Sequence, residues 1–356
     1  MITIKKFKNQ WEAEKFLKEK IGAYDEGAKI MAPKTEILNV FVKDVKNQAA
    51  AILKQDILSI GGDAAIHADV VRFEKGVSDV LLMATLSQLN RLTKKLKIQP
   101  YGLENISEEI DKVLINYFKQ NKQPQIMGIL NLTPDSFFDG GKFNSIETAS
   151  AQAQKMINEG ADILDVGAES SRPGFQPISE EEELARLLPV LKELRKNFKI
   201  KISVDTYKPN VARAALAIGA DIINDISGEL TGFDCPIILM HNQKKLEYSD
   251  VVLDIIEYFG SKNLKNVIID PGIGFGKGKT VEHNLEILKR IEEFKVLGVP
   301  ILVGASRKSF IGKEVNDRLF GSLAVATLMA ERGVDILRVH DVGATRDVLR
   351  MVEKLC

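Results

Sequence analysis

The sequence predicts an α/β fold, with a (β/α)8 TIM barrel in residues 121–356 and a small α/β domain in residues 1–120. The chain has 356 residues, about a hundred more than such a barrel needs. Six of the 26 glycines lie in residues 1–120, so tight turns gather in the second part. Eight short apolar runs alternate there with helical stretches, as expected of parallel strands joined by helices.

Residues 1–120 contain helical and strand-like patterns without a cluster of residues that suggests chemistry. Ser107 is expected to cap an amphipathic helix. His67 is expected to be solvated or structural. The polar segment 121–124 contains a proline and is typical of a linker, so it predicts the domain boundary. Helical spacing is found in segments 12–20, 45–59 and 107–118. Strand-like patterns are found in 35–42 and 79–85, and the second of these leads into a helix that ends near residue 97.

The apolar runs of the second part predict eight strands that are buried on both faces. They begin near residues 126, 163, 200, 222, 236, 267, 300 and 336. Helical stretches lie between most of them, at 147–160, 180–197, 208–219, 282–297 and 321–333. Several of these helices end at a glycine just before the next strand, which is typical of helix-to-strand connections: Gly160, Gly219, Gly298 and Gly333.

The gap between the fourth and fifth runs is short, so we expect an abbreviated crossover there. A doubly wound open sheet is the alternative fold, and eight repeating units favour the closed barrel.

Composition restricts the partners and the compartment. Lys+Arg and Asp+Glu are both 49, so the formal net charge is zero. This argues against nucleic acid or an anionic membrane as the main partner, because both recruit basic surfaces. Two cysteines, Cys235 and Cys356, predict a reduced, cytoplasmic location. We find neither a signal-peptide pattern nor an apolar run long enough to span a membrane.

Polar residues follow all eight predicted strands, at the end of a barrel where functional sites lie. Asp205, Asn224 and Asp270 would offer acceptors and an amide to a donor-rich heterocycle. Lys308 could donate to the same ring, and two apolar side chains could pack against its faces: Met240 and Phe275. Two other acids are as readily explained as helix caps or loop braces: Asp225 and Asp341.

The same barrel mouth has the composition of an anion site. Its candidates are Arg172, Arg338, His340, Ser171 and Ser306. Arginine presents a fork of donors that suits phosphate oxygens. We expect residues 306–309 to open a helix, whose N-terminus favours negative charge. A ring and a phosphate in one pocket indicate an activated heterocycle with a phosphate leaving group.

Two other motifs carry less weight. Residues 272–280 resemble a phosphate-binding Walker A loop, but Ile273 stands where that loop needs glycine. His241 and His340 have no zinc-binding spacing. A single Mg²⁺ held by Asn131 and phosphate oxygens is the expected metal site, since Mg²⁺ takes few protein ligands.

Taken together, the strand ends resemble those of the dihydropteroate synthase family. The resemblance lies in residues 126–141, 162–174, 202–209, 222–225, 270–277, 304–312 and 338–342. The run MGILNLTPDSFFDGG is its most specific part. The family implies a TIM barrel that joins 6-hydroxymethyl-7,8-dihydropterin pyrophosphate to 4-aminobenzoate, giving 7,8-dihydropteroate and pyrophosphate. It also implies Mg²⁺ and a homodimer.

The resemblance assigns roles to the candidate residues. It implies that the pterin pyrophosphate contacts Ser171, Asp205, Asn224, Met240, Asp270, Phe275, Lys308, Arg338 and His340. It implies that 4-aminobenzoate lies under the loops 133–142 and 169–178, near Thr133, Phe137, Pro173, Ser306 and Ser309. The catalytic residues would be Asp135, Arg172, Lys308 and His340, with Asp135 stabilising a cationic pterin methylene. Asn131 would lie beside Mg²⁺.

The sequence departs from the family pattern at three places. Residues 168–172 read AESSR where GESTR is usual, and Met240-His241 is followed by Asn-Gln-Lys instead of Met-Gln-Gly. Residues 1–120 are absent from compact members and contain no motif of the pyrophosphokinase or the aldolase of the same pathway. The alternatives are a pterin-binding barrel that transfers a methyl group to a corrinoid, and a non-catalytic paralogue. Retention of Ser171, Arg172 and residues 306–309 favours the synthase over both.

Overall fold

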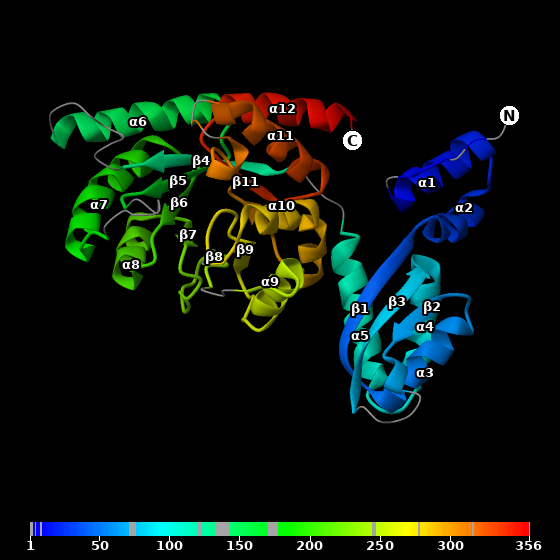
Figure 1. The fold of residues 1–356 in the computed structure, drawn as a ribbon. Helices are drawn as coiled ribbons and strands as arrows, with labels where there is room; N and C mark the ends of the chain where they lie inside the picture. Colours follow the sequence, from blue (N-terminus) through cyan, green and yellow to red (C-terminus); the bar gives the residue numbers. More distant parts are fainter. Residues whose placement is uncertain are drawn as a thin grey trace. The chain divides into compact units, whose positions relative to one another are not determined.

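The computed structural model describes residues 3, 5–7, 9–70, 76–119, 123–132, 142–169, 177–243, 247–276, 278–312, 314 and 317–355, without the side chains of 142–145. The chain divides into two compact units, Met1–Ile115 and Asn116–Cys356. Both are drawn in Figure 1. Within the described ranges, no helix is long and apolar enough to cross a membrane.

The first unit is built on a three-stranded antiparallel sheet in the order β1-β3-β2. Alternate residues of β3 are buried, because successive side chains of a strand point to opposite faces. The covered face packs against α3 and α4. The elements are α1 (Gln10–Phe16), α2 (Asp25–Met31), β1 (Ile37–Lys46), α3 (Asn47–Leu58), β2 (Asp63–Ile66), β3 (Val77–Thr85), α4 (Leu86–Leu96) and α5 (Leu103–Tyr117), with a π-helical turn at Leu17–Ile21 and 3-10 turns at Ala32–Lys34 and Ala68–Val70.

Two expectations for this unit are wrong in detail. Residues 45 and 46 belong to β1, since Val45 pairs with Ser78 of β3. Ser107 does not begin a helix, because α5 starts one turn earlier at Leu103. The Ser107 side chain is buried and its hydroxyl donates to the carbonyl oxygen of Thr93 at 2.8 Å.

The second unit is a barrel of eight parallel strands, which confirms the predicted fold class (Figure 1). The strand order is β10-β11-β4-β5-β6-β7-β8-β9. A parallel bridge between Ile269 and Ile301 joins the two outer strands. The strands are β4 (Gln125–Asn131), β5 (Ile163–Gly167), β6 (Lys201–Asp205), β7 (Ile222–Asp225), β8 (Ile237–Met240), β9 (Val267–Asp270), β10 (Leu302–Val303) and β11 (Ile336–Val339).

Helices cover the outside of this barrel, and all five predicted helical stretches are present, although 282–297 is α-helical only to Lys289 and continues as a 3-10 segment. They are α6 (Lys142–Asn158), α7 (Glu180–Asn197), α8 (Pro209–Ile218), α9 (Val251–Gly260), α10 (Val281–Lys289), α11 (Arg318–Glu331) and α12 (Val342–Leu355), with 3-10 segments η5 (Ile291–Leu297) and η6 (Ser309–Ile311). The four predicted helix-ending glycines have positive φ, from 70° to 106°, which only glycine adopts without strain. No helix lies in residues 226–236, so the crossover between β7 and β8 is abbreviated as expected.

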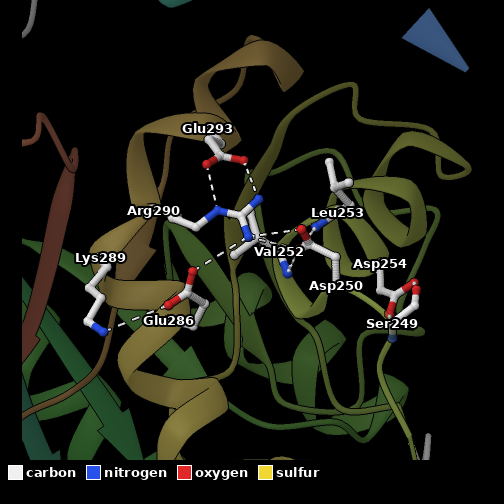
Figure 2. A network of polar contacts seen from close by, with 9 residues as sticks. All are labelled: Ser249, Asp250, Val252, Leu253, Asp254, Glu286, Lys289, Arg290 and Glu293. Atoms are coloured by element: carbon white, nitrogen blue, oxygen red, sulfur yellow. Dashed lines mark hydrogen bonds and ion pairs between the residues drawn. The ribbon is translucent and has the colours of Figure 1, made fainter. Parts of the chain in front are cut away.

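A network of charged side chains fixes the start of α9 against the end of α10 (Figure 2). Asp250 caps α9 by accepting from the amides of Val252 and Leu253 at 3.0 and 3.1 Å. The Arg290 guanidinium contacts this carboxylate at 2.9 Å and Glu293 at 2.6 Å. One side chain therefore ties two helices on the side of the barrel that carries β8 and β9.

The barrel interior changes from apolar to polar along the strands. A buried cluster fills its lower part: Met127, Ile163, Ile222, Ile238, Ile268, Leu302 and Ile336. Positions two residues later on the same strands face the same way, because the side-chain period of a strand is two. These positions include Asp165, Asn224, Met240, Asp270 and Arg338. The apolar cluster thus forms a floor beneath a polar barrel mouth.

Candidate active site

Arg338 lies at the barrel mouth and contacts two carboxylates. Its Nε donates to Asp165 Oδ2 at 2.6 Å, and its second terminal nitrogen donates to Asp205 Oδ2 at 2.7 Å. The three residues come from β11, β5 and β6. Asp205 ends its strand, whereas Asp165 and Arg338 lie inside theirs. Asp165 is fully buried and the Arg338 side chain is 18% exposed. The guanidinium is therefore held at both of these donors.

Asp165 is the residue that the sequence prediction missed. It also accepts from the side-chain amide of Asn224 at 3.1 Å, so it joins Asn224 to Arg338. The sequence prediction counts Asp165 among the polar residues of the second strand end but gives it no role in the site. The signal was available, since a carboxylate in the middle of a strand buried on both faces must find a partner.

The ionisation of this group depends on burial. Burial raises the pKa of Asp205 to about 7, although the nearby Arg338 opposes the shift, and Asp165 adds to it. For Arg338, burial favours the neutral form, but Asp165 and Asp205 outweigh it and raise the pKa further. Two buried carboxyls thus share one permanent cation, and Asp205 changes charge near neutral pH.

Asp270 at the end of β9 lies on the same rim. Its carboxylate accepts from the amide of Gly272 at 2.8 Å. Burial raises its pKa, whereas the Gly272 amide and the charge of Lys308 lower it. The structure therefore brings together four predicted ring-binding residues: Asp205, Asn224, Asp270 and Lys308.

Lys308 extends across an aromatic ring. Its Nζ lies 3.6 Å from the centre of the Phe275 ring, close enough for a cation–π interaction. Burial lowers the pKa of Lys308 to about 8, against the favourable charge of Asp270. Phe275 therefore contacts the lysine that was predicted to share its ligand. Met240 ends β8 and is almost fully buried.

The expectation that residues 306–309 open a helix is wrong. Among the described residues here, the first helical element is the 3-10 turn Ser309–Ile311, and α11 begins at Arg318. Arg307 adopts a left-handed φ of 56° and pairs with Asp341 at 2.5 Å, which turns the chain out of a helical path. The exposed Ser309 therefore lacks the helix N-terminus that was expected to favour a carboxylate.

Ser306 and His340 form a second polar contact at the mouth. The Ser306 hydroxyl lies 3.1 Å from His340 Nδ1 and accepts from the His340 amide at 3.2 Å. Asn131 ends β4 opposite Gly167 in register, and Gly167 pairs in turn with Asp205. The predicted anion-site residues that the structure describes are Ser306, Arg338 and His340. Together with the predicted metal ligand, they lie at the rim that carries Asp205.

Six predicted site residues lie outside the described part of the chain. They are Thr133, Asp135, Phe137, Ser171, Arg172 and Pro173. Their roles stay predictions. The start and end of the second loop are described, and Lys208 contacts both. Its Nζ donates to Glu169 at 2.6 Å and to the Ile178 carbonyl at 2.8 Å, and it also pairs with Glu183.

Asp225, which was predicted to be either a site residue or a loop brace, and Lys279 of the Walker-like segment both contact the backbone. Asp225 accepts from three backbone amides and the Ser227 hydroxyl in the loop after β7, so it braces that loop. Lys279, the lysine of the Walker-like segment, turns back onto backbone carbonyls of its own loop. Among the described residues, no group of three or more His, Cys, Asp or Glu could hold a metal ion.

Comparisons with known proteins point to one group. Residues 127–340 match the family model described as pterin binding enzyme. A dihydropteroate synthase of Clostridium beijerinckii is 44% identical over 260 residues, covering 66% of this chain and 96% of that protein. The crystal structure of a dihydropteroate synthase from Clostridium difficile has a TM-score of 0.62 and 41% identity, covering 67% of this chain and 98% of that one.

A second kind of relative is longer. A probable bifunctional folylpolyglutamate synthase/dihydropteroate synthase of Haloferax volcanii is 38% identical over 347 residues, covering 84% of this chain. The chain spans only 41% of the length of that relative. Because Asn116–Cys356 makes up about two thirds of the chain, this match extends into the first unit.

Proposed function

Because the chain belongs to the dihydropteroate synthases within the pterin-binding enzyme family, we propose that it condenses 6-hydroxymethyl-7,8-dihydropterin pyrophosphate with 4-aminobenzoate. The products are 7,8-dihydropteroate and pyrophosphate, and the reaction transfers a pterin-methyl group. The observation that carries the proposal is the contact of Arg338 with Asp165 and Asp205, beside Asn224 and above an apolar barrel floor.

The described side chains match the edge of a pterin ring. Carboxylates of Asp205 and Asp270 can accept from the amino group and ring N–H, while the Asn224 amide can serve either function. Lys308 can donate to the ring carbonyl or a ring nitrogen. Arg338 and Phe275 would flank the faces of the ring, and Met240 would pack beneath it.

Similar proteins bind ligands of this class. The Clostridium difficile structure was determined in the presence of pteroic acid. Structures of the Xanthomonas albilineans dihydropteroate synthase contain 4-aminobenzoic acid in one case and 7,8-dihydropteroate in another. Of these ligands, 4-aminobenzoic acid is one proposed substrate and 7,8-dihydropteroate is the proposed product, so they support the proposed reaction of this chain.

We propose that the pyrophosphate lies near Ser306 and His340, with Mg²⁺ held by Asn131 and phosphate oxygens. Asn131 fits this group, because its amide offers a hard oxygen ligand on the rim of the mouth. Bound there, Mg²⁺ would neutralise charge on the leaving group.

The residues of this chain contribute mainly by positioning and electrostatics. Departure of pyrophosphate leaves a cationic methylene whose charge spreads into the pterin. The carboxylates of Asp205 and Asp270 are oriented toward a ring that becomes more positive, so they stabilise it most in the transition state. The amine of 4-aminobenzoate is neutral at pH 7 and attacks without a strong base. Its lost proton passes to solvent or pyrophosphate.

A pyrophosphate-release assay with both substrates tests this function. Wild-type protein is expected to release pyrophosphate only when both substrates are present. Lys308→Ala removes the donor to the ring and is expected to lower kcat/KM by about 100-fold. The exposed Lys289→Ala is the matched control, because Lys289 lies on the outer surface of α10. Absence of release by the wild type, or equal rates in the two variants, would overturn the proposal.

We also propose a homodimer in the cytoplasm. Along α11, Phe320, Ala324 and Leu328 are exposed at a spacing of four residues, and the residues Phe320 and Leu328 are 80% and 44% exposed. An apolar stripe of this kind suits burial against a second copy. Sedimentation of Phe320→Glu is expected to show a monomer where the wild type sediments as a dimer. The two cysteines support the compartment.

A further inference from the structure

Lys279 directs its ammonium group at three backbone carbonyl oxygens. Its Nζ donates to the oxygens of His241 at 3.2 Å, Pro271 at 2.7 Å and Gly272 at 3.0 Å. An ammonium has three N–H donors, so these contacts can use all of them. The carbonyls follow two neighbouring strands, β8 and β9. The side chain therefore joins the ends of the strands that carry Met240 and Asp270.

The setting is costly for a cation. Within the described part of the chain, no carboxylate oxygen lies within ion-pair distance of the Lys279 ammonium. Burial lowers the pKa of Lys279 to about 7, and the charge of Asp270 is what opposes the shift. A buried charge that rests mainly on neutral dipoles needs a compensating benefit in folding or function.

Gly272 connects Lys279 to the site. Gly272 has φ +73°, and a Cβ there would approach the His241 carbonyl oxygen to 2.2 Å. The backbone at Gly272 therefore packs directly against the backbone that follows β8. Its carbonyl accepts from Lys279, and its amide donates to the Asp270 carboxylate at 2.8 Å. The backbone turn at Gly272, which Lys279 contacts, therefore also orients the carboxylate of Asp270.

Gly272 also positions the aromatic side of the site. Its carbonyl accepts from the amide of Phe275 at 3.1 Å. The Phe275 ring in turn lies 3.6 Å from the ammonium of Lys308. Three groups at the mouth, Asp270, Phe275 and Lys308, thus depend on one turn.

We propose that Lys279 is a positioning residue for the pterin half of the site, which acts by fixing the Gly272 turn that orients Asp270 and Phe275. The inference rests on the proposed synthase reaction. The proposal gives the Lys279 ammonium a role in the affinity for the pterin substrate. The part of the mouth at Ser306 and His340 does not depend on Lys279. Loss of the ammonium should therefore weaken the pterin substrate selectively.

The test is steady-state kinetics of Lys279→Met in the full chain, with each KM measured separately by pyrophosphate release. Methionine keeps the length and volume of the side chain and removes the charge and donors. We expect the KM for pterin pyrophosphate to rise by about 10-fold or more, and the KM for 4-aminobenzoate to change by less than about 3-fold. Lys289→Met is the matched control and should change neither. Lys279→Arg keeps the charge and should recover part of the pterin affinity.

A merely structural lysine would give a different result. Partial unfolding lowers kcat through the fraction of active protein and leaves both KM values unchanged, and that outcome would overturn the proposal, as would wild-type constants. If Lys279→Met does not fold, the two KM values are measured in Lys279→Gln, whose shorter side-chain amide keeps a donor. An unchanged KM for pterin pyrophosphate in that variant counts against the proposal. Pterin binding followed by fluorescence separates the two hypotheses. A wild type that binds pterin without releasing pyrophosphate contradicts the synthase reaction, and the affinity ratio between wild type and variant still decides the role of Lys279.

Discussion

The guanidinium of Arg338 on β11 donates to the carboxylate of Asp165 on β5 at 2.6 Å, reaching across the intervening strand β4. The same guanidinium donates to Asp205 on β6. Three strands, β11, β5 and β6, are therefore joined at the barrel mouth through one side chain. Since Asp165 is fully buried, removal of the cation leaves a carboxylate that water cannot reach.

Arg338→Met is expected to destabilise the barrel and abolish turnover. A buried ion pair that loses one partner typically costs about 3–5 kcal/mol, because the remaining charge stays unpaired. The measurement is urea unfolding together with pyrophosphate release. Arg350→Met is the control, since Arg350 pairs with Asp347 at the surface and such pairs are worth less than about 1 kcal/mol. Equal losses in the two variants would show that the Arg338 contacts contribute little.

Asp205 and Lys308 predict a bell-shaped pH dependence of kcat/KM for pterin pyrophosphate, which reports the free enzyme. The pKa of Asp205 is raised by burial to about 7, so its accepting carboxylate forms as the pH rises through that value. The pKa of Lys308 is lowered by burial to about 8, so its donor charge is lost above it. Asp205→Asn should remove the acidic limb, and Lys308→Arg should remove the part of the alkaline limb that Lys308 causes. Burial lowers the pKa of Lys279 to about 7, so loss of its ammonium contributes the rest of the alkaline limb. A profile with limbs unchanged in both variants would contradict these assignments.

Stability should depend on pH in the opposite sense to the acidic limb. The pKa of Asp205 lies at about 7 in the folded chain and at 3.8 in an unperturbed one, so the folded state holds the proton more tightly between these values. Its contribution to stability is complete below pH 3.8 and is lost as the pH rises through 7. The unfolding free energy of the wild type should therefore fall relative to Asp205→Asn over this interval. Parallel curves for the two proteins in urea titrations would contradict the shift.

The barrel could be predicted from the sequence because its strands are buried on both faces. The run Ile237–Met240, for example, is apolar up to the polar His241 that follows it. The glycines after the helices mark where each helix ends and the chain turns into the next strand. The strand β2 (Asp63–Ile66) was missed, since two alanines in four residues give little strand propensity and only pairing with β3 defines it.

The site was predictable where polar residues follow a strand and not where contacts between strands decide. Asp205, Asn224 and Asp270 stand at strand ends and were found. The sequence indicates that Asp165 needs a partner, but the arrangement of the strands is needed to show that its partners are Asn224 and Arg338. The helix expected at 306–309 failed because Arg307 adopts a left-handed conformation and pairs with Asp341, a contact between two strand ends that local sequence does not encode.

Removal of residues 1–115 is expected to leave kcat/KM within about 3-fold of the full chain, because a compact unit with its own core can fold alone. The Clostridium beijerinckii relative is matched over 96% of its length by 66% of this chain, which is about the share of the second unit. A truncated chain that starts at Asn116 keeps the hydrogen bond from its side chain to the Val296 carbonyl. Pyrophosphate release by the two forms at equal concentration is the measurement. A loss of ten-fold or more with the fold intact would assign the first unit a part in catalysis.

Gly228→Ala and Gly232→Ala form a matched pair for the loop between β7 and β8. Both glycines have positive φ, 71° and 81°, so either alanine should cost about 1–2 kcal/mol of backbone strain. A Cβ at Gly228 would also meet the carbonyl oxygen of Met240 at 2.5 Å, whereas the space around Gly232 is open. Overlap with backbone adds roughly 1–3 kcal/mol, so urea unfolding should show the larger loss for Gly228→Ala. Because the displaced carbonyl belongs to Met240, the same variant should raise the KM for pterin pyrophosphate, and Gly232→Ala should not. Equal unfolding free energies would mean that the end of β8 moves away without resistance, and that Met240 is not held by this contact.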